Sequence, residues 1–147
     1  DEEIDMTGHL TNTCLQGETA LVVPFWDLQD EKINSDIKAG VFEKVCEITK
    51  ELFKAGTTVD KMNFQPIDHA VEIFGVDFLV NDDYSVTLLE VNSYPDFKQT
   101  GNDLKQLIDE LFEEVAHNVV APLMDDTTTS QDPKSALVPV LKQDESP

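Results

Sequence analysis

The fold is decided by residues 74–92, which read FGVDFLVNDDYSVTLLEVN. Both ends of this stretch are rich in β-branched and aromatic residues, which favour extended strands. Between them, residues 81–84 (NDDY) form a cluster of turn-favouring side chains. The pattern predicts a β-hairpin with strands over about 71–80 and 85–91, in which Val80 pairs with Ser85.

Amphipathic helices are predicted on both sides of the hairpin. From about Asp36 to Ala55 apolar residues recur at helical spacing, with Ser35 placed as an N-cap and Gly56 just beyond the end. From about Asp103 to Val120 a second apolar stripe precedes Pro122, which is expected to end that helix. We therefore expect an α/β (α+β) fold, an antiparallel sheet with packed helices. The second helix also carries four carboxylates on its polar face: Asp109, Glu110, Glu113 and Glu114. They form either ordinary solvated surface or an acidic patch for a basic partner.

Upstream of the first helix, residues 21–26 read LVVPFW. They favour a short strand stopped by Pro24. We expect Phe25 and Trp26 to pack in the core rather than to form an exposed aromatic patch.

The two ends of the chain are expected to be less regular than the centre. Residues 1–8 are acidic and predict a frayed start, and residues 9–124 predict one domain. Residues 125–147 are polar and contain proline, which predicts a disordered or loosely docked tail. Its apolar part, residues 136–141 (ALVPVL), either docks on the same domain or serves as a short linear ligand.

The charge balance excludes several classes of partner. The chain has 147 residues, with 30 Asp and Glu against 10 Lys and no Arg, and a formal net charge of −20. Such a surface cannot displace counterions from nucleic-acid phosphates, and anionic membranes would repel it. A protein partner with a neutral or basic surface is favoured over direct contact with nucleic acid or membrane.

The sequence shows no sign of export or membrane insertion. Its apolar runs are too short to span a bilayer, and its acidic first residues are unlike a signal peptide. Cys14 and Cys46 match no disulfide framework or zinc pattern. We expect a cytoplasmic protein. Because the first residue is Asp1 rather than Met, we also expect a piece of a longer chain.

The hairpin carries a candidate metal site. With Val80 paired to Ser85, Asp77 lies opposite Leu88 and diagonal to Glu90, on the face that also carries Asn92. Two carboxylates would be costly within these apolar runs unless a cation neutralised them. Their hard oxygens, with the amide oxygen, suit Mg²⁺ rather than Zn²⁺.

The hairpin carboxylates have two other interpretations. The pattern alone leaves open the alternative that Asp77 and Glu90 pair with Lys or face solvent at a sheet edge. A calcium loop starting at Asn81 is excluded, because Val86 and Asn92 stand where an EF-hand needs Gly and Glu.

Three motifs stand in order along the chain: residues 9–12 (HLTN), 74–80 (FGVDFLV) and 88–95 (LLEVNSYP). In this combination and spacing they resemble the tubulin-tyrosine ligase family of the ATP-grasp superfamily. The resemblance covers roughly residues 8–124. It implies that the chain is the C-terminal part of an ATP-grasp domain.

The resemblance implies an ATP-dependent ligase, in which ATP phosphorylates a carboxylate and an amine displaces phosphate to form an amide. Asp77, Glu90 and Asn92 would bind Mg²⁺ bridging the ATP phosphates, and Thr11 and Asn12 would lie beside those phosphates. No catalytic residue is assigned. The chain is particularly similar to an acidic fungal family member associated with processing bodies, which implies the cytoplasm, P-bodies and the mRNA decapping machinery as its setting.

The chain also departs from the family pattern. Residues 16–18 (QGE) stand where family members commonly carry a basic residue, and the strands with the nucleotide-binding Lys and Arg lie upstream of His9 in the family. This chain alone is therefore expected to be inactive and not to bind ATP tightly. Its acidity also disfavours the acidic tubulin tail, so the acceptor stays open. The competing hypothesis is a catalytically weak or inactive scaffold that serves as a protein-interaction module.

Overall fold

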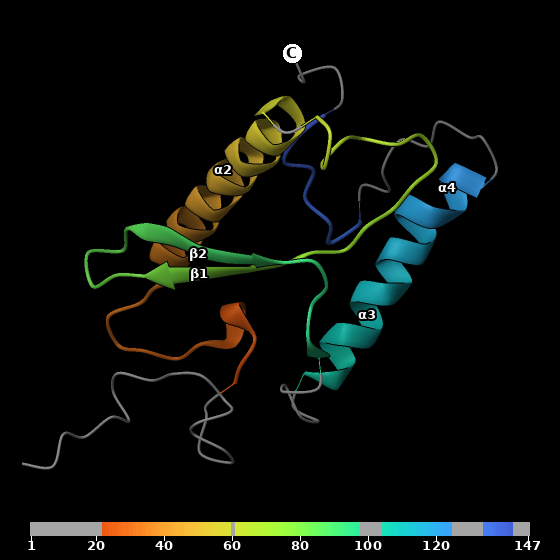
Figure 1. The fold of residues 1–147 in the computed structure, drawn as a ribbon. Coiled ribbons are helices and arrows are strands. Elements are labelled where there is room, and N and C mark those ends of the chain that lie inside the picture. Colours follow the sequence, from red (N-terminus) through yellow and green to blue (C-terminus); the bar gives the residue numbers. More distant parts are fainter. Residues whose placement is uncertain (1–21, 60, 98–103, 125–133, 143–147) are drawn as a thin grey trace, which may run out of the picture.

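The computed structural model describes residues 22–59, 61–97, 104–124 and 134–142. The two strands form one antiparallel sheet, α2 packs against β2, and α3, η4 and α4 form a second, continuous helical rod to one side of the sheet (Figure 1). The described residues therefore confirm a mixed α and β fold with an antiparallel sheet. The elements in chain order are η2 (Phe25–Asp27), α2 (Ser35–Val59), β1 (Gly75–Val80), β2 (Val86–Asn92), α3 (Lys105–Val115), η4 (Ala116–Val120) and α4 (Ala121–Met124).

The turn of the hairpin sets a different register from the predicted one. Val80 pairs with Val86 rather than with Ser85. The Tyr84 N–H donates to Asn81 O at 2.9 Å, and the Asn81 N–H donates to Ser85 O at 2.9 Å. Tyr84 has a φ of 61°, the left-handed conformation that closes three-residue hairpin loops. The prediction was wrong because this conformation is normally signalled by Gly or Asn, and here a tyrosine adopts it.

Contacts from two other segments hold Tyr84 in this strained conformation. Its hydroxyl donates to Lys32 O at 3.1 Å, and Lys44 Nζ of α2 donates to Tyr84 O at 3.1 Å. The tip of the hairpin is thereby tied to α2 and to the loop before it. Such tertiary contacts offset the cost of a non-glycine residue at positive φ.

A β-bulge shifts the register further along the hairpin. The ladder is irregular between Asp77 and Phe78, where Leu89 of β2 is an extra residue. Asp77 consequently lies opposite Glu90, and not opposite Leu88 as predicted. Strict alternation cannot reveal a bulge, because the inserted residue looks like an ordinary member of the strand.

Helix α2 begins and ends differently from the prediction. The Ile37 N–H donates to Asn34 Oδ1 at 2.9 Å, so Asn34 is the N-cap and Ser35 is the first helical residue. Gly56 lies inside the helix rather than beyond its end. A Cβ on Gly56 would lie 3.2 Å from the Phe64 ring, so this glycine provides room for packing and does not terminate the helix.

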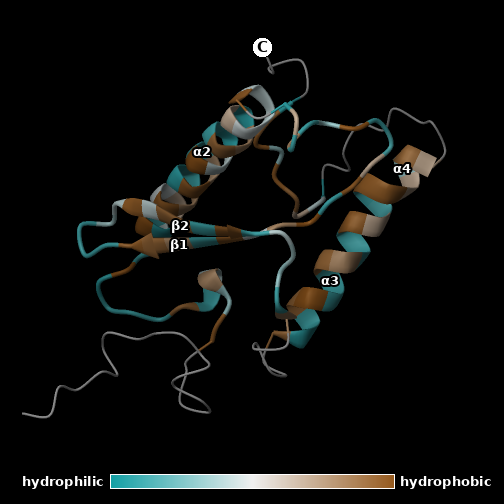
Figure 2. Cartoon of the chain, in the orientation of Figure 1, coloured by the Kyte–Doolittle hydropathy of each residue, from teal (hydrophilic) through white to brown (hydrophobic). Residues whose placement is uncertain are grey.

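The second helical rod passes through the proline that was expected to end it. The Ala121 N–H donates to Ala116 O, five residues back, so η4 is a π-helical turn. Pro122 follows as the second residue of α4, and the helix continues to Met124. Pro122 thus lies in the first turn of α4, directly after the π-helical turn, where a residue without an N–H is tolerated. Hydrophobic and hydrophilic residues alternate along this rod, as expected of an amphipathic helix (Figure 2).

The segment before α2 is pinned by a lysine rather than paired as a strand. Phe25–Asp27 form a 3-10 turn, so the predicted short strand is not formed there. Lys38 of α2 is only 8% exposed, and its Nζ donates to Trp26 O at 2.6 Å and to Leu28 O at 2.7 Å. The Trp26 ring lies 5.5 Å from that of Phe42 but remains 54% exposed, so its predicted core role was wrong.

The apolar core of the described residues is small. Val41 of α2 is the buried hydrophobic residue among them, at 5% exposure. A second apolar centre is the aromatic trio of Phe53, Phe64 and Phe74, whose ring centroids are 5.4–6.1 Å apart. The trio joins α2, the loop after it and the entry to β1. Within the described segments, no helix combines the length and the apolar character needed to cross a membrane.

Part of the C-terminal region is also described. Residues 134–142 form neither a helix nor a strand and run between α2 and the helical rod (Figure 1). Leu137, Val140 and Leu141 are half-buried there. The predictions for residues 1–8, 125–133 and 143–147 lie outside the described residues.

Candidate functional site

Three oxygen-bearing side chains meet on the hairpin, at the end away from its turn. Asp77 of β1 lies directly opposite Glu90 of β2. Asn92, two residues further along β2, donates its amide to both carboxylates, with Nδ2 3.4 Å from Asp77 Oδ2 and 3.5 Å from Glu90 Oε1. The structure therefore brings together the three residues that the sequence singled out.

The β-bulge places the two carboxylates on the same face of the sheet. Leu88 faces α2, where it lies beside Leu52 along a shallow depression. Phe78 pairs with Leu88 and shares its face. Asp77 precedes Phe78 in β1, so its side chain points to the opposite, open face. Unbroken alternation from Leu88 would turn Glu90 towards α2, but the extra residue Leu89 returns it to the open face.

The sequence predicted apolar surroundings for the two carboxylates, but both of them are exposed. Asp77, Glu90 and Asn92 are all exposed, because a two-stranded sheet covered by α2 on one side leaves its other face open. Neither carboxylate forms an ion pair with any lysine in the described segments. The predicted desolvation cost is therefore absent, and the close approach of two like charges remains.

The arrangement fits a hard divalent cation. The positive end of the Asn92 amide points between the two carboxylates, which marks where a shared cation would lie. Rotation of that amide by half a turn would present its oxygen instead, giving two carboxylates and one neutral oxygen ligand. Mg²⁺ is commonly held by one or two carboxylates, with water and phosphate completing its octahedron. Across the described part of the chain, no three His, Cys, Asp or Glu side chains are grouped to hold a metal, so the site lacks a zinc-type cage.

Gly75 and Pro95 also shape the site, although the residue pattern predicted no role for them. Gly75 lies opposite Asn92, and a Cβ on Gly75 would come within 3.3 Å of Pro95 Cα and 3.6 Å of Asn92 Cβ. The missing side chain lets the chain after β2 fold back close to β1. Both residues belonged to the quoted motifs, so the motif itself was the available signal.

The other predicted site residues cannot be placed. Thr11 and Asn12, expected beside the nucleotide phosphates, lie outside the described residues. Their assignments remain predictions.

Comparison with known proteins identifies the family. Residues 1–129 match the model of the tubulin-tyrosine ligase family. The chain is 42% identical over 132 residues to "Probable tubulin–tyrosine ligase PBY1" of Saccharomyces cerevisiae, covering 87% of this chain and 17% of that protein. It is also 42% identical over 123 residues to "Probable tubulin–tyrosine ligase C12B10.04" of Schizosaccharomyces pombe, covering 82% of this chain and 29% of that protein. The chain thus spans less than a third of either relative, and it belongs to the tubulin-tyrosine ligase family.

Proposed function

We propose that this chain is the metal-binding part of an ATP- and Mg²⁺-dependent ligase that joins a carboxylate to an amine, within an ATP-grasp domain. The observation that carries the proposal is the convergence of Asp77, Glu90 and Asn92 on the open face of the hairpin. Membership of the tubulin-tyrosine ligase family supports the reaction class.

Each residue of the trio has a distinct part in this proposal. Asp77 and Glu90 supply the negative charge, and Asn92 supplies a neutral oxygen after rotation of its amide. Bound there, Mg²⁺ would neutralise charge on the ATP phosphates, which is the main requirement of phosphoryl transfer. Thr11 and Asn12 would lie beside those phosphates. Because the trio is exposed, water and phosphate oxygens have access to the remaining coordination positions.

The acceptor is proposed to be neutral or basic. The chain carries a net charge of −20 and no Arg, and a strongly acidic peptide such as the tubulin tail would be repelled. From the family resemblance, we also propose a cytoplasmic setting within P-bodies, with the mRNA decapping machinery as a protein partner.

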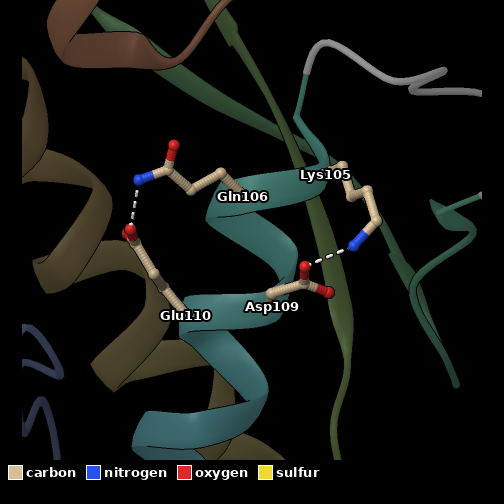
Figure 3. A network of polar contacts seen from close by, with 4 residues as sticks. All are labelled: Lys105, Gln106, Asp109 and Glu110. Carbon is tan, nitrogen blue, oxygen red and sulfur yellow. Dashed lines mark hydrogen bonds and ion pairs between the residues drawn. The ribbon is translucent and has the colours of Figure 1, made fainter.

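A second candidate function is a catalytically weak or inactive scaffold. The observation that favours it is the acidic surface of α3, where Asp109, Glu110 and Glu113 are exposed. Part of that surface is already paired within the helix, since Lys105 Nζ donates to Asp109 and Gln106 Nε2 donates to Glu110 (Figure 3). Exposed pairs of this kind contribute little to stability, so a basic partner could displace them.

A metal titration tests the proposed site directly. Mn²⁺ has the same ligand preference as Mg²⁺, and its binding to the 147-residue chain is measured by electron paramagnetic resonance. Glu90→Gln removes one of two charged ligands and is expected to weaken binding about tenfold or more. Glu113→Gln removes an equally exposed carboxylate from α3 and serves as the matched control for non-specific binding. Equal Mn²⁺ affinity in wild type and Glu90→Gln would exclude the hairpin as the metal site.

A calorimetric titration tests whether this chain carries only part of the ATP site. Because the family's nucleotide-binding Lys and Arg precede the matched motifs, Mg·ATP is expected to show no micromolar affinity for this chain. Micromolar affinity would mean that the 147 residues of this chain suffice for nucleotide binding.

A further inference from the structure

Residues 134–142, here called the strap, contact the helical rod through a polar anchor at Ser135. Ser135 Oγ donates to Glu114 Oε2 at 2.6 Å and accepts from the Leu137 N–H at 3.1 Å. Asn118 of the π-helical turn donates to the same Glu114 oxygen at 2.9 Å. The carboxylate of Glu114 is thus half-buried and committed to the strap, unlike its exposed neighbours on α3.

The far end of the strap borders a broad apolar groove. The groove has a volume of about 980 Å³ and is walled by α2, by residues 62–72 and by Leu123. Its lining includes Phe53, Phe64 and Phe74, and also Val140, Leu141 and Lys142 from the end of the strap. The strap therefore covers only part of an apolar surface, and Met62 at the groove remains 91% exposed.

We propose that this groove is part of a docking surface for an extended apolar peptide in which proline stands between aliphatic residues, and that the end of the strap, which lines the groove, covers part of that surface in cis. The strap indicates the chemistry that the surface accepts, because Val140 and Leu141 at the end of its LVPVL sequence (residues 137–141) line the groove. Proline stiffens such a segment and lowers the entropy lost on docking. Asp68 and Glu72 at the groove disfavour an acidic peptide.

The anchor makes the cis contact releasable. A negative charge on Ser135 would face the Glu114 carboxylate directly, and the chain contains no Arg to bind it. The strap would then detach while the groove residues keep their own packing. A tethered segment competes at an effective concentration in the millimolar range, so its release exposes the surface to peptides in trans.

Fluorescence polarisation of a labelled synthetic peptide tests the proposal. The probe has the sequence of residues 134–142 (KSALVPVLK), and the receptor is the 147-residue chain. Ser135→Asp is expected to bind the probe at least about tenfold more tightly than wild type, because the competing strap is released. Ala136→Asp adds the same charge to an exposed strap residue that lies outside residues 137–141, and is expected to behave as wild type.

A groove variant and a local measurement complete the test. Ser135→Asp combined with Met62→Asp should lose the probe, and since Met62 is exposed, circular dichroism should show an unchanged fold. Hydrogen exchange should show faster exchange of residues 137–142 in Ser135→Asp. Equal probe affinity in wild type and Ser135→Asp would overturn the proposal, and so would probe binding that ignores Met62→Asp. None of these readouts depends on metal or ATP, so their outcome is independent of whether the proposed ligase site binds Mg²⁺.

Discussion

The substitution Lys38→Met tests what holds the first described segment on α2. Methionine keeps the unbranched apolar stem, and it removes the ammonium that donates to Trp26 O and Leu28 O. Both carbonyls would lose a partner that water cannot readily replace, because Lys38 is 8% exposed. The variant therefore isolates the two hydrogen bonds from the packing of the side chain.

The expected magnitude follows from these two contacts. Each hydrogen bond to a charged group contributes about 1.5–3 kcal/mol to the free energy of unfolding. Removing a buried ammonium also removes its desolvation cost, which offsets part of that loss. We expect a net loss of about 3 kcal/mol, a large share of the roughly 5–15 kcal/mol that stabilises a typical domain.

Urea unfolding measures this loss. Far-UV circular dichroism follows the helices, and fluorescence of Trp26, the one tryptophan in the chain, follows the pinned segment. Lys54→Met on the same helix is the matched control, with an expected change within about 0.5 kcal/mol. A loss below about 1 kcal/mol for Lys38→Met would refute the argument that these hydrogen bonds hold the segment.

Two further predictions concern a glycine pair and a turn carboxylate. Gly40→Ala should raise the free energy of unfolding by about 0.5–1 kcal/mol, because a Cβ there meets nothing within 4 Å, whereas Gly56→Ala should gain less, since its Cβ meets the Phe64 ring at 3.2 Å. Equal gains in urea titrations would contradict this reading of Gly56. Side-chain and backbone hydrogen bonds from Ser85 lower the pKa of Asp83 below its ordinary value. The associated stabilisation is therefore present above the unfolded-state pKa and is lost as pH falls through the folded-state pKa. An NMR titration of Ser85→Ala should show the Asp83 pKa moving up towards its ordinary value, and an unchanged pKa would exclude the Ser85 hydroxyl as a cause.

Much of the candidate site was predictable from local pattern. The hairpin, both helices and the trio of Asp77, Glu90 and Asn92 follow from alternation, helical spacing and the positions of polar residues within apolar runs. These signals are local, because a strand or an amphipathic helix repeats its pattern within a few residues. Residue pairing was less predictable, since one bulge at Leu89 changes which residues face one another.

The sequence by itself determined the class of elements, their order and the acidic, Arg-free surface. Only the tertiary structure decided that Glu90 faces Asp77, that Lys38 is buried against two carbonyls and that Ser135 fastens the strap to Glu114. Each of these depends on a contact between segments, or on one inserted residue. The free energy of such a contact depends on which groups meet across space, and the spacing of residues along the chain does not encode that meeting.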